Sequence, residues 1–563
     1  MYLRETRQKR ADGSYLTHLQ LAESLWDPVK RHTRIRILYN CGRADDPAVA
    51  ERLRRLARGI LRRCSPEEII AEEPTWRLCN AWPYGDLYVL EQLWQRLGIA
   101  VVLQEVLGKR KLGFAVERAL FAMVANRACG PCSKLYCYEQ WLREEVRIEG
   151  TEDLKLHHLY RAMDLLEAHK EAVEEAIYFR LADLLNLDVE LIFYDTTSLH
   201  FEIDEEDAGR GEADEVRGSR AAGAKSYPAL RKRGKSKNGR DDTPQCVVGL
   251  AVTRDGFPVR HWVFPGNTVD VSTVERIKAD LKGWQLGRCV FVGDAGMVSE
   301  KNLKALSLSG GRYIVCMPIH PGGEISEEVL SRPGRYQEVA ENLRVKEIVV
   351  GEGERRRRYV LCHNPQEELR QRAHREQVLA ELQAELESLR DPTCEGHSKR
   401  VCALRASSRY GRYLKLTAKG QLRIDETKVK VALRLDGKFV VHSNDDTLTA
   451  EDMALAYKQL QRVEEAWRTL KSGLRLRPVF HWAVHRIHAH VFLTVLALLI
   501  ERLAEQACGD TWRNIRNDLK RIKLAQLLSP HGTVWQVTEP PPEALKRLKS
   551  LQIKNPPPLL QFG

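Results

Sequence analysis

The chain has 563 residues, of which 43% are hydrophobic and 7% aromatic, so a wholly disordered protein is excluded. Its net charge of +12 fits a polyanionic partner but does not establish one. Thirteen irregularly spaced cysteines favour a reducing, cytoplasmic location over a disulfide-bonded scaffold. We expect no secretory signal and no transmembrane helix, because the N-terminus lacks an apolar segment and the longest apolar run, residues 491–500, is too short.

The first part of the chain changes from strand-like to helical sequence at about residue 46. Residues 34–39 largely alternate polar and apolar side chains, so residues 1–45 are predicted to be β-rich. From residue 46 to 186, apolar residues recur at helical spacing, as at i, i+4 and i+8 from Val89. We therefore expect a helical domain over residues 46–186.

An acidic segment and then a basic segment follow a short apolar run that ends at Asp195. Residues 202–215 hold eight acidic side chains and one arginine, and residues 217–240 hold nine Lys or Arg and no acid. A solvated, mobile loop is the ordinary interpretation of such charge runs. The sharper hypothesis is a basic flap that closes over a phosphate backbone, and a loop that orders only on binding satisfies both.

The segment around these charges has the element order of an RNase H-like core. The order is strand, β-hairpin, helix, strand, helix and strand, predicted over residues 189–194, 245–264, 269–282, 289–292, 299–306 and 312–317. Asp195 and Asp294 come at the carboxyl ends of the first and fourth strands, where sites in open α/β sheets cluster. A carboxylate there must find a cation, a donor or water, because burying it bare is costly.

Residues 318–448 depart from this pattern and are predicted to form a β-rich insertion that splits the core. Strands are expected at residues 429–433 and 438–441, and the core resumes with a long helix from 450 to about 472, with Thr449 as its N-cap. The last segment reads as a basic, Pro-containing tail. The expected domains are residues 1–45, 46–186, 187–317, 318–448, 449–508 and 509–563.

Tyr457, Glu464 and Lys471 are seven residues apart on the predicted long helix. Seven residues turn a helix by about 700°, so each side chain lies only about 20° from the last and the three form one stripe. Two strand-end aspartates and one helix glutamate supply hard oxygen ligands for two Mg²⁺ ions about 3.5–4 Å apart if the helix packs across the sheet. Lys471 is a candidate contact for a DNA phosphate.

Each of these carboxylates alone has an ordinary structural explanation. A strand-end aspartate such as Asp195 or Asp294 is usually a turn or cap residue, and Glu464 alone is a surface charge. The adjacent Glu465 leaves the choice of glutamate to the stripe. The conjunction of the three positions is what favours a catalytic site.

Further motifs accompany these positions. The stripe follows the pattern Y-x2-R-x3-E-x6-K, except that Leu460 stands at the arginine position. The chain resembles insertion-sequence DDE transposases, the group marked by that helix. One subgroup is similar more widely, through the motifs at residues 194–198, 249–252, 264–267, 292–296 and 457–491.

The resemblance implies Mg²⁺-dependent cleavage at transposon ends and joining of the 3′-hydroxyl to target DNA. Asp195, Asp294 and Glu464 would be the catalytic triad and the ligands of two Mg²⁺ ions, with Mn²⁺ as an alternative ion. The departure at Leu460 puts one DNA contact in doubt but not the metal ligands. Candidate DNA contacts are Tyr457, Lys471, Arg468, Lys232, Lys235 and Asn267, although a turn asparagine is the ordinary explanation of Asn267.

The resemblance also implies partners and a setting. The partners would be the terminal inverted repeats and target DNA, held by a homodimer in a synaptic complex without membrane association, in a prokaryotic cytoplasm. The helical region over 46–186 would read the terminal repeats. Insertions at the place of residues 318–448 can help to handle a hairpinned DNA end.

Two other functions are alternatives to transposition. A catalytically inactive DNA-binding protein derived from a transposase is one rival, and an RNase H-like nuclease without joining activity is the other.

The C-x-x-C at residues 129–132 follows helical sequence, which disfavours a thioredoxin-type redox site. Three histidines share a helical face between residues 481 and 488, but no Cys, Asp or Glu nearby completes a zinc site, so a DNA-facing or core-edge patch is favoured.

Overall fold

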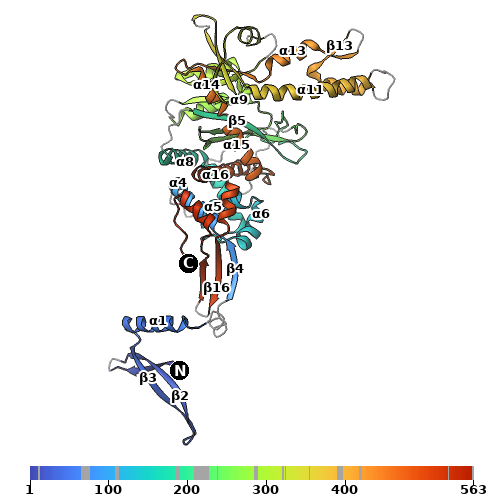
Figure 1. Ribbon diagram of the computed structural model, residues 1–563. Helices are drawn as coiled ribbons and strands as arrows, with labels where there is room; N and C mark the ends of the chain where they lie inside the picture. The colour runs from blue at the N-terminus through green and yellow to red at the C-terminus, as the bar shows by residue number, and fades with distance from the viewer. Residues whose placement is uncertain are drawn as a thin grey trace. The chain divides into compact units, whose positions relative to one another are not determined.

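A computed structural model of the protein is shown as a ribbon in Figure 1. It describes residues 1–10, 13–64, 77–107, 113–185, 191–207, 227–237, 239–284, 289–319, 323, 325–353, 356–389, 397–417, 421–529 and 532–560. The chain divides into two compact units. The first comprises Met1–Ala81, Leu524–Thr538 and Pro557–Gly563, and the second comprises Trp82–Lys523 and Glu539–Pro556.

The first unit begins with a three-stranded antiparallel sheet and a helix, as the alternating sequence of residues 1–45 predicts. Its elements are β1 (Tyr2–Lys9), β2 (Tyr15–Asp27), β3 (His32–Arg43) and α1 (Pro47–Leu61). The side chain of Asp46 caps α1 by accepting a hydrogen bond from the amide of Ala48 at 2.9 Å.

The segment predicted as a tail is folded. It forms two helices and three strands, and β4 from the region predicted as helical joins those strands in a sheet of order β18–β17–β16–β4. The elements are β4 (Arg77–Pro83), α17 (Trp512–Leu519), β16 (Lys523–Ser529), β17 (Gly532–Val537), α18 (Pro542–Ser550) and β18 (Leu559–Leu560). Its many charges and prolines obscured short periodic runs such as Trp512, Ile515 and Leu519, which are buried.

The second unit contains a helical layer. Its helices are α3 (Gly85–Arg96), α4 (Ile99–Leu107), α5 (Val116–Cys129), α6 (Lys134–Tyr136), the π-helix η1 (Cys137–Glu145), α7 (Leu156–Ala168), α8 (Lys170–Leu185) and α16 (Val484–Cys508). α5 is buried along almost its whole length and packs against α7 and α16. α16 is long and apolar enough to cross a membrane, but 89% of its most apolar stretch is buried inside the protein, as in a core helix.

A nine-stranded mixed sheet forms the rest of the second unit, in the order β10–β11–β12–β15–β9–β8–β5–β6–β7. Its strands are β5 (Leu191–His200), β6 (Gln245–Val252), β7 (Pro258–Pro265), β8 (Val290–Gly293), β9 (Arg312–Met317), β10 (Gln337–Ala340), β11 (Leu343–Val350), β12 (Arg357–His363) and β15 (Lys438–Ser443). β5, β8 and β9 run parallel, and the other neighbours are antiparallel. Every residue of β6 is buried, as expected of a central strand covered on both faces.

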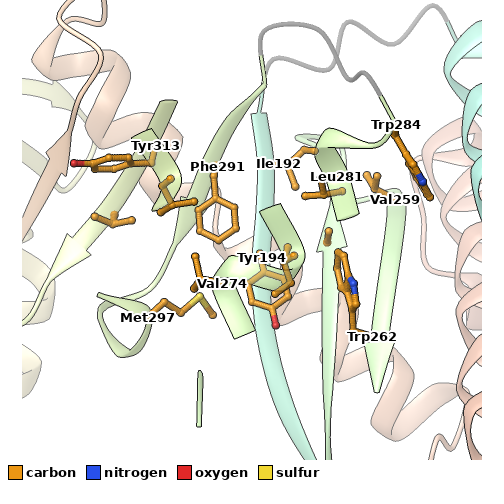
Figure 2. Close-up of a cluster of buried hydrophobic side chains, with 14 of the residues drawn as sticks. Ile192, Tyr194, Val259, Trp262, Val274, Leu281, Trp284, Phe291, Met297 and Tyr313 are labelled. Carbon is orange, nitrogen blue, oxygen red and sulfur yellow. The ribbon is translucent and has the colours of Figure 1, made fainter. Parts of the chain in front are cut away.

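Two helices connect the parallel strands and close an apolar core over them (Figure 2). They are α9 (Asp270–Lys282), which follows β7, and α10 (Glu300–Ser307), which is joined to β8 and β9 by the 3-10 turns η2 (Ala295–Met297) and η3 (Leu308–Gly310). In the core, Tyr194 packs edge-on against Trp262 at 5.8 Å between ring centroids, and its hydroxyl contacts Thr273 Oγ1 at 3.2 Å. The residue before Asp195 is therefore fixed between the sheet and α9.

The segment predicted as an insertion extends the same sheet and adds a small helical lobe. β10, β11 and β12 continue the sheet through β15, which pairs with β9. The lobe contains α11 (Pro365–Ser388), α12 (His397–Ala406), α13 (Glu426–Leu435), β13 (Leu414–Leu416) and β14 (Leu422–Ile424), with short helical turns η4 (Ile325–Val329) and η6 (Gly411–Tyr413) in the same segment. Its apolar side chains form a cluster of their own around Val378 and Leu382.

The prediction of a strand at residues 429–433 is wrong, because these residues lie in α13. The side chain of Asp425 caps this helix by accepting from the amide of Thr427 at 3.1 Å. Alternation over five residues fits a strand, but the cap favours a helix that buries Val429.

The predicted helix from 450 to 472 is divided. It forms α14 (Ala450–Lys458), α15 (Gln461–Arg468) and a short π-helical turn η7 (Thr469–Gly473). Thr449 is the N-cap of α14, as predicted, and exchanges hydrogen bonds with Asp452. Tyr457 and Glu464 therefore lie on two separate helices, and not on one face of a continuous helix as predicted.

Candidate active site

Asp195 lies inside β5 rather than at its end, contrary to the prediction. The strand continues to His200, because Thr196, Thr197 and Ser198 are buried and extend the ladder with β6. The parallel pairing of β5 with β8, however, is seen only as far as Phe193 and Val292. Asp195 is thus the second residue beyond the point where this pairing stops.

Asp294 follows β8 directly and is level with Asp195, since each is two residues beyond the Phe193–Val292 pair. Asp294 is exposed and Asp195 is partly buried. The hydroxyl of Tyr457, at the end of α14, donates a hydrogen bond to Asp294 Oδ1 at 3.0 Å. Burial and the nearby charge of Asp294 raise the pKa of Tyr457, so this hydroxyl stays protonated as a donor.

Glu464 reaches the same edge of the sheet from α15, which packs against β5 and β6. Burial raises the pKa of Glu464, and the negative charges of Asp195 and Asp294 raise it further. Glu464 therefore lies within electrostatic reach of both aspartates. Glu465 points to a different partner, since its carboxylate contacts Arg462 at 3.2 Å.

The position that departs from the helix motif lies between α14 and α15. Leu460 is 7% exposed and packs inward, so an apolar side chain suits its surroundings. Its amide donates to the carbonyl of Tyr457 at 2.9 Å, which continues the backbone turn between the two helices. The substitution of leucine for arginine is thus matched by burial.

Two residues that the sequence analysis did not assign lie against Asp195. The ammonium of Lys237 is 3.3 Å from Asp195 Oδ1 and 3.0 Å from Asp270 Oδ2. Thr196 Oγ1 donates to Asp270 Oδ1 at 2.5 Å. Lys237 belongs to the predicted basic segment and Asp270 begins α9, but only their proximity in the fold marks them as part of the site.

The decisive comparison is with protein families. A family model described as "Transposase DDE domain" matches residues 216–500, just over half of the chain. The chain belongs to the DDE transposase family. A search of curated proteins gives no match.

Among solved structures, this transposase chain is similar to two transposase–DNA complexes. One is the piggyBac transposase synaptic complex with hairpin DNA, at 10% identity and a TM-score of 0.32, over 78% of this chain and 79% of that chain. The other is the Mos1 transposase paired-end complex with left transposon end, at 11% identity and a TM-score of 0.14, over 40% of this chain and 58% of that chain.

The predicted DNA contacts of the transposase differ in their surroundings. Arg468 is exposed one turn beyond Glu464, and its charge only partly offsets the burial and the two aspartates that raise the pKa of that carboxyl. Lys471 is partly buried. Its burial and, to a smaller extent, the charge of Arg477 lower its pKa. Both lie on the side of α15 and η7 that reaches the carboxylates.

The remaining predicted contacts are not brought to the carboxylates by any contact in the described parts of the chain. Lys232 is engaged with the acidic segment, through the carbonyl of Asp207 at 2.6 Å and Glu206 at 3.4 Å. Lys235 and Asn267 are exposed, Asn267 in the turn after β7. Much of the predicted basic flap, residues 217–226 and 238, lies outside the described residues.

Two of the three histidines between residues 481 and 488 contact acidic side chains of α7. His485 lies 3.1 Å from Asp164, and His488 lies 3.4 Å from Glu167. These contacts belong to the packing of α16 on α7. They agree with the core-edge alternative for this patch.

The carboxylates of the transposase suit a divalent metal by their chemistry. Asp195, Asp294 and Glu464 offer hard oxygen donors, and their mutual repulsion is what a cation relieves. Within the described ranges, no three His, Cys, Asp or Glu side chains are grouped closely enough to hold a metal ion. The cation that lies at Asp195 is the ammonium of Lys237.

Proposed function

We propose that the protein is an insertion-sequence transposase that cleaves DNA at transposon ends and joins the 3′-hydroxyl to target DNA. The single observation that supports this most is the convergence of Asp195, Asp294 and Glu464 at one edge of the sheet, in a chain of the DDE transposase family. Two of these side chains are exposed, so a DNA phosphate can approach them.

The strand order supports an RNase H-like core as the catalytic scaffold. The hairpin β6–β7 lies beside β5, and β5, β8 and β9 follow as parallel neighbours. This is the arrangement expected from the predicted element order, with the acidic residues after the parallel strands. β10–β12 and β15 continue the sheet beyond β9.

The residues of the site have separable roles in this proposal. Asp195, Asp294 and Glu464 would hold two Mg²⁺ ions, or Mn²⁺ in their place, and Tyr457 orients the Asp294 carboxylate. The bound metal supplies Lewis-acid activation of the attacking oxygen and stabilisation of the leaving oxygen. Lys471 and Arg468 supply positive charge for the DNA phosphates on the same side.

We assign recognition of the terminal repeats to residues 46–186. The exposure of the helices in this region then favours one of them as the DNA contact. α5 is buried, so it offers no surface to DNA. α1 is largely exposed and has exposed arginines at positions 52, 54, 55 and 58. We assign α1 to phosphate contacts with end DNA, and two copies of the chain to the synaptic complex, because two ends must be joined in one event.

The test is cleavage and strand transfer of DNA that carries the inverted repeats flanking the gene, in the presence of Mg²⁺. The wild-type chain should release the end and join it to target DNA, and Asp195→Asn and Asp294→Asn should each lose at least about 10²-fold in rate. Asp255→Asn, in the exposed turn between β6 and β7, is the matched control and should keep the wild-type rate. Full cleavage by Asp195→Asn would overturn the assignment, and cleavage without joining would identify a nuclease.

A further inference from the structure

Lys237 occupies the place of a cation in the carboxylate site. Its ammonium has three partners: Asp195 Oδ1 at 3.3 Å, Asp270 Oδ2 at 3.0 Å and the carbonyl of Thr196 at 2.9 Å. An ammonium has three protons, so every donor of Lys237 is used within the site. The backbone is held as well, since the amide of Lys237 donates to Ser198 Oγ at 3.2 Å.

The two carboxylates that contact Lys237 stand on ordered elements of the fold. Asp195 is fixed by the β5–β6 ladder, in which it pairs with Leu250. Asp270 is the first residue of α9, where the helix dipole favours a carboxylate, and it accepts a hydrogen bond from Thr196 Oγ1. The strand and the helix that carry the two carboxylates therefore do not need the ammonium to hold their backbones in place.

Lys237 itself is poised to leave. Its side chain is 39% exposed, so the ammonium can move into solvent without unpacking the core. Two residues further along, Gly239 has a φ of +70°, in the left-handed region that favours glycine. The backbone of this loop therefore turns at Gly239, close to Lys237 in the sequence.

We propose that Lys237 is a resident counter-ion of the active site, and that its ammonium and a divalent cation bind Asp195 in a mutually exclusive way. The metal-free protein is held together at this point by Lys237, and metal binding releases the lysine toward solvent. This inference rests on the proposed function for the role of Asp195 as a metal ligand. It adds Lys237 and Asp270 as positioning residues that set how readily the metal enters.

The first experiment measures Mn²⁺ binding to the DNA-free, full-length protein by titration calorimetry. Lys237→Met keeps most of the side-chain length without the charge, and it should bind Mn²⁺ about tenfold more tightly than wild type, because the competing cation is gone. Lys237→Arg keeps the charge and should stay within about twofold of wild type. Unchanged or weaker binding by Lys237→Met would overturn the proposal.

The matched control is Lys282→Met, which removes the same charge from the far end of α9. Lys282 is exposed and contacts Ser309 Oγ at 3.1 Å, about 18 Å along the helix from Asp270. It should leave the Mn²⁺ affinity unchanged. An equal gain in affinity for this variant would mean that net charge, and not the contact with Asp195, sets the affinity, which contradicts the proposal.

A second measurement needs no variant and so does not depend on whether Lys237→Met folds. Acetylation of the wild-type protein by acetic anhydride, read by mass spectrometry, should modify Lys237 faster with Mg²⁺ than without it. The exposed Lys301, paired with Glu275 at 3.0 Å, should react at the same rate in both conditions. Equal reactivity of Lys237 in both conditions would overturn the proposal.

These readouts separate the inference from the proposed function. If the wild-type chain does not cleave end DNA but the Mn²⁺ affinities and the acetylation respond as described, the transposase activity fails and the counter-ion role stands. If the chain cleaves and joins DNA but Lys237→Met binds Mn²⁺ no more tightly, only the counter-ion role fails.

Discussion

The hydroxyl of Tyr457 ties the end of α14 to the carboxylate of Asp294, one of the three proposed catalytic residues. We expect Tyr457→Phe to slow DNA cleavage about tenfold, because a hydrogen bond to a charged group is lost while the ring remains. The ring still packs near Phe439, at 5.3 Å between centroids, so the thermal unfolding midpoint should stay close to that of wild type. A cleavage rate equal to that of wild type would show that the Asp294 carboxylate needs no such donor.

At this scale, what could be predicted depended on how local each signal was. An apolar run followed by an acid marks Asp195 and Asp294, and both signals lie within a few residues of sequence. Lys237 and Asp270 meet only because the loop before β6 and the start of α9 come together in the fold. No spacing in the sequence reports such a contact.

At the element scale, α8 is fastened to β7 by a buried charge cluster. Glu174 on α8 accepts from the amide of His261 at 2.8 Å, and Lys170 lies 2.7 Å from Glu174 and donates to the carbonyl of His261 at 2.9 Å. Burial raises the pKa of Glu174, but the charge of Lys170 and the hydrogen bonds outweigh it and bring the pKa down to about 2.

This cluster predicts a pH-dependent stability. A folded-state pKa near 2, against an ordinary value of 4.5, contributes about 3 kcal/mol to the free energy of unfolding at neutral pH. The contribution is complete above about pH 4.5 and is lost as the pH falls toward 2. Urea unfolding at a series of pH values should show this loss in wild type.

The control for that prediction is Glu174→Gln. The variant should be less stable than wild type at pH 7 and should lack the part of the pH dependence between about 4.5 and 2 that Glu174 contributes. If the two proteins lose stability in parallel over this interval, the cluster does not fasten α8 to the sheet.

Element types followed the sequence where periodicity and caps agreed. The strand at Arg312–Met317 has the predicted bounds, and the helix predicted over residues 299–306 is α10, which Ser299 caps. The helix α13 was missed because the alternation of residues 429–433 indicates a strand, whereas the cap residue Asp425 indicates a helix. The break between α14 and α15 was missed because the side-chain periodicity runs on through Gln459 and Leu460, where the helical hydrogen bonding is interrupted.

At the scale of the whole molecule, the net charge of +12 is distributed differently from what the sequence suggests. The basic run at 355–358 is balanced in its described part, because Arg356, Arg357 and Arg358 lie 3.4, 3.8 and 2.7 Å from acidic partners. α1, by contrast, carries exposed arginines at positions 52, 54, 55 and 58 against one acid of its own, Glu51, which lies 3.7 and 3.4 Å from Arg54 and Arg55. Folding alone places these acids beside the run, so the difference could not be predicted from composition.

This contrast predicts a salt dependence of DNA binding. Fluorescence anisotropy with end DNA should show the logarithm of the association constant falling linearly with the logarithm of salt concentration. The double variant Arg54→Gln and Arg58→Gln should reduce the slope by about 2, because each contact with a phosphate accounts for about 1. The charge-matched variant Arg356→Gln and Arg357→Gln should leave the slope unchanged, and equal effects of both would contradict the assignment of α1.

The central claim is that Asp195, Asp294 and Glu464 form the active site. The most direct test compares substitutions of two adjacent glutamates, Glu464 and Glu465. Glu464 and Glu465 are adjacent on α15, yet Glu464 lies within reach of the two aspartates and Glu465 contacts Arg462. The measurement is the yield of joined product in a strand-transfer assay with Mg²⁺ and end DNA. The account predicts that Glu464→Gln abolishes joining while Glu465→Gln retains it, and joining by Glu464→Gln at the wild-type level would contradict it.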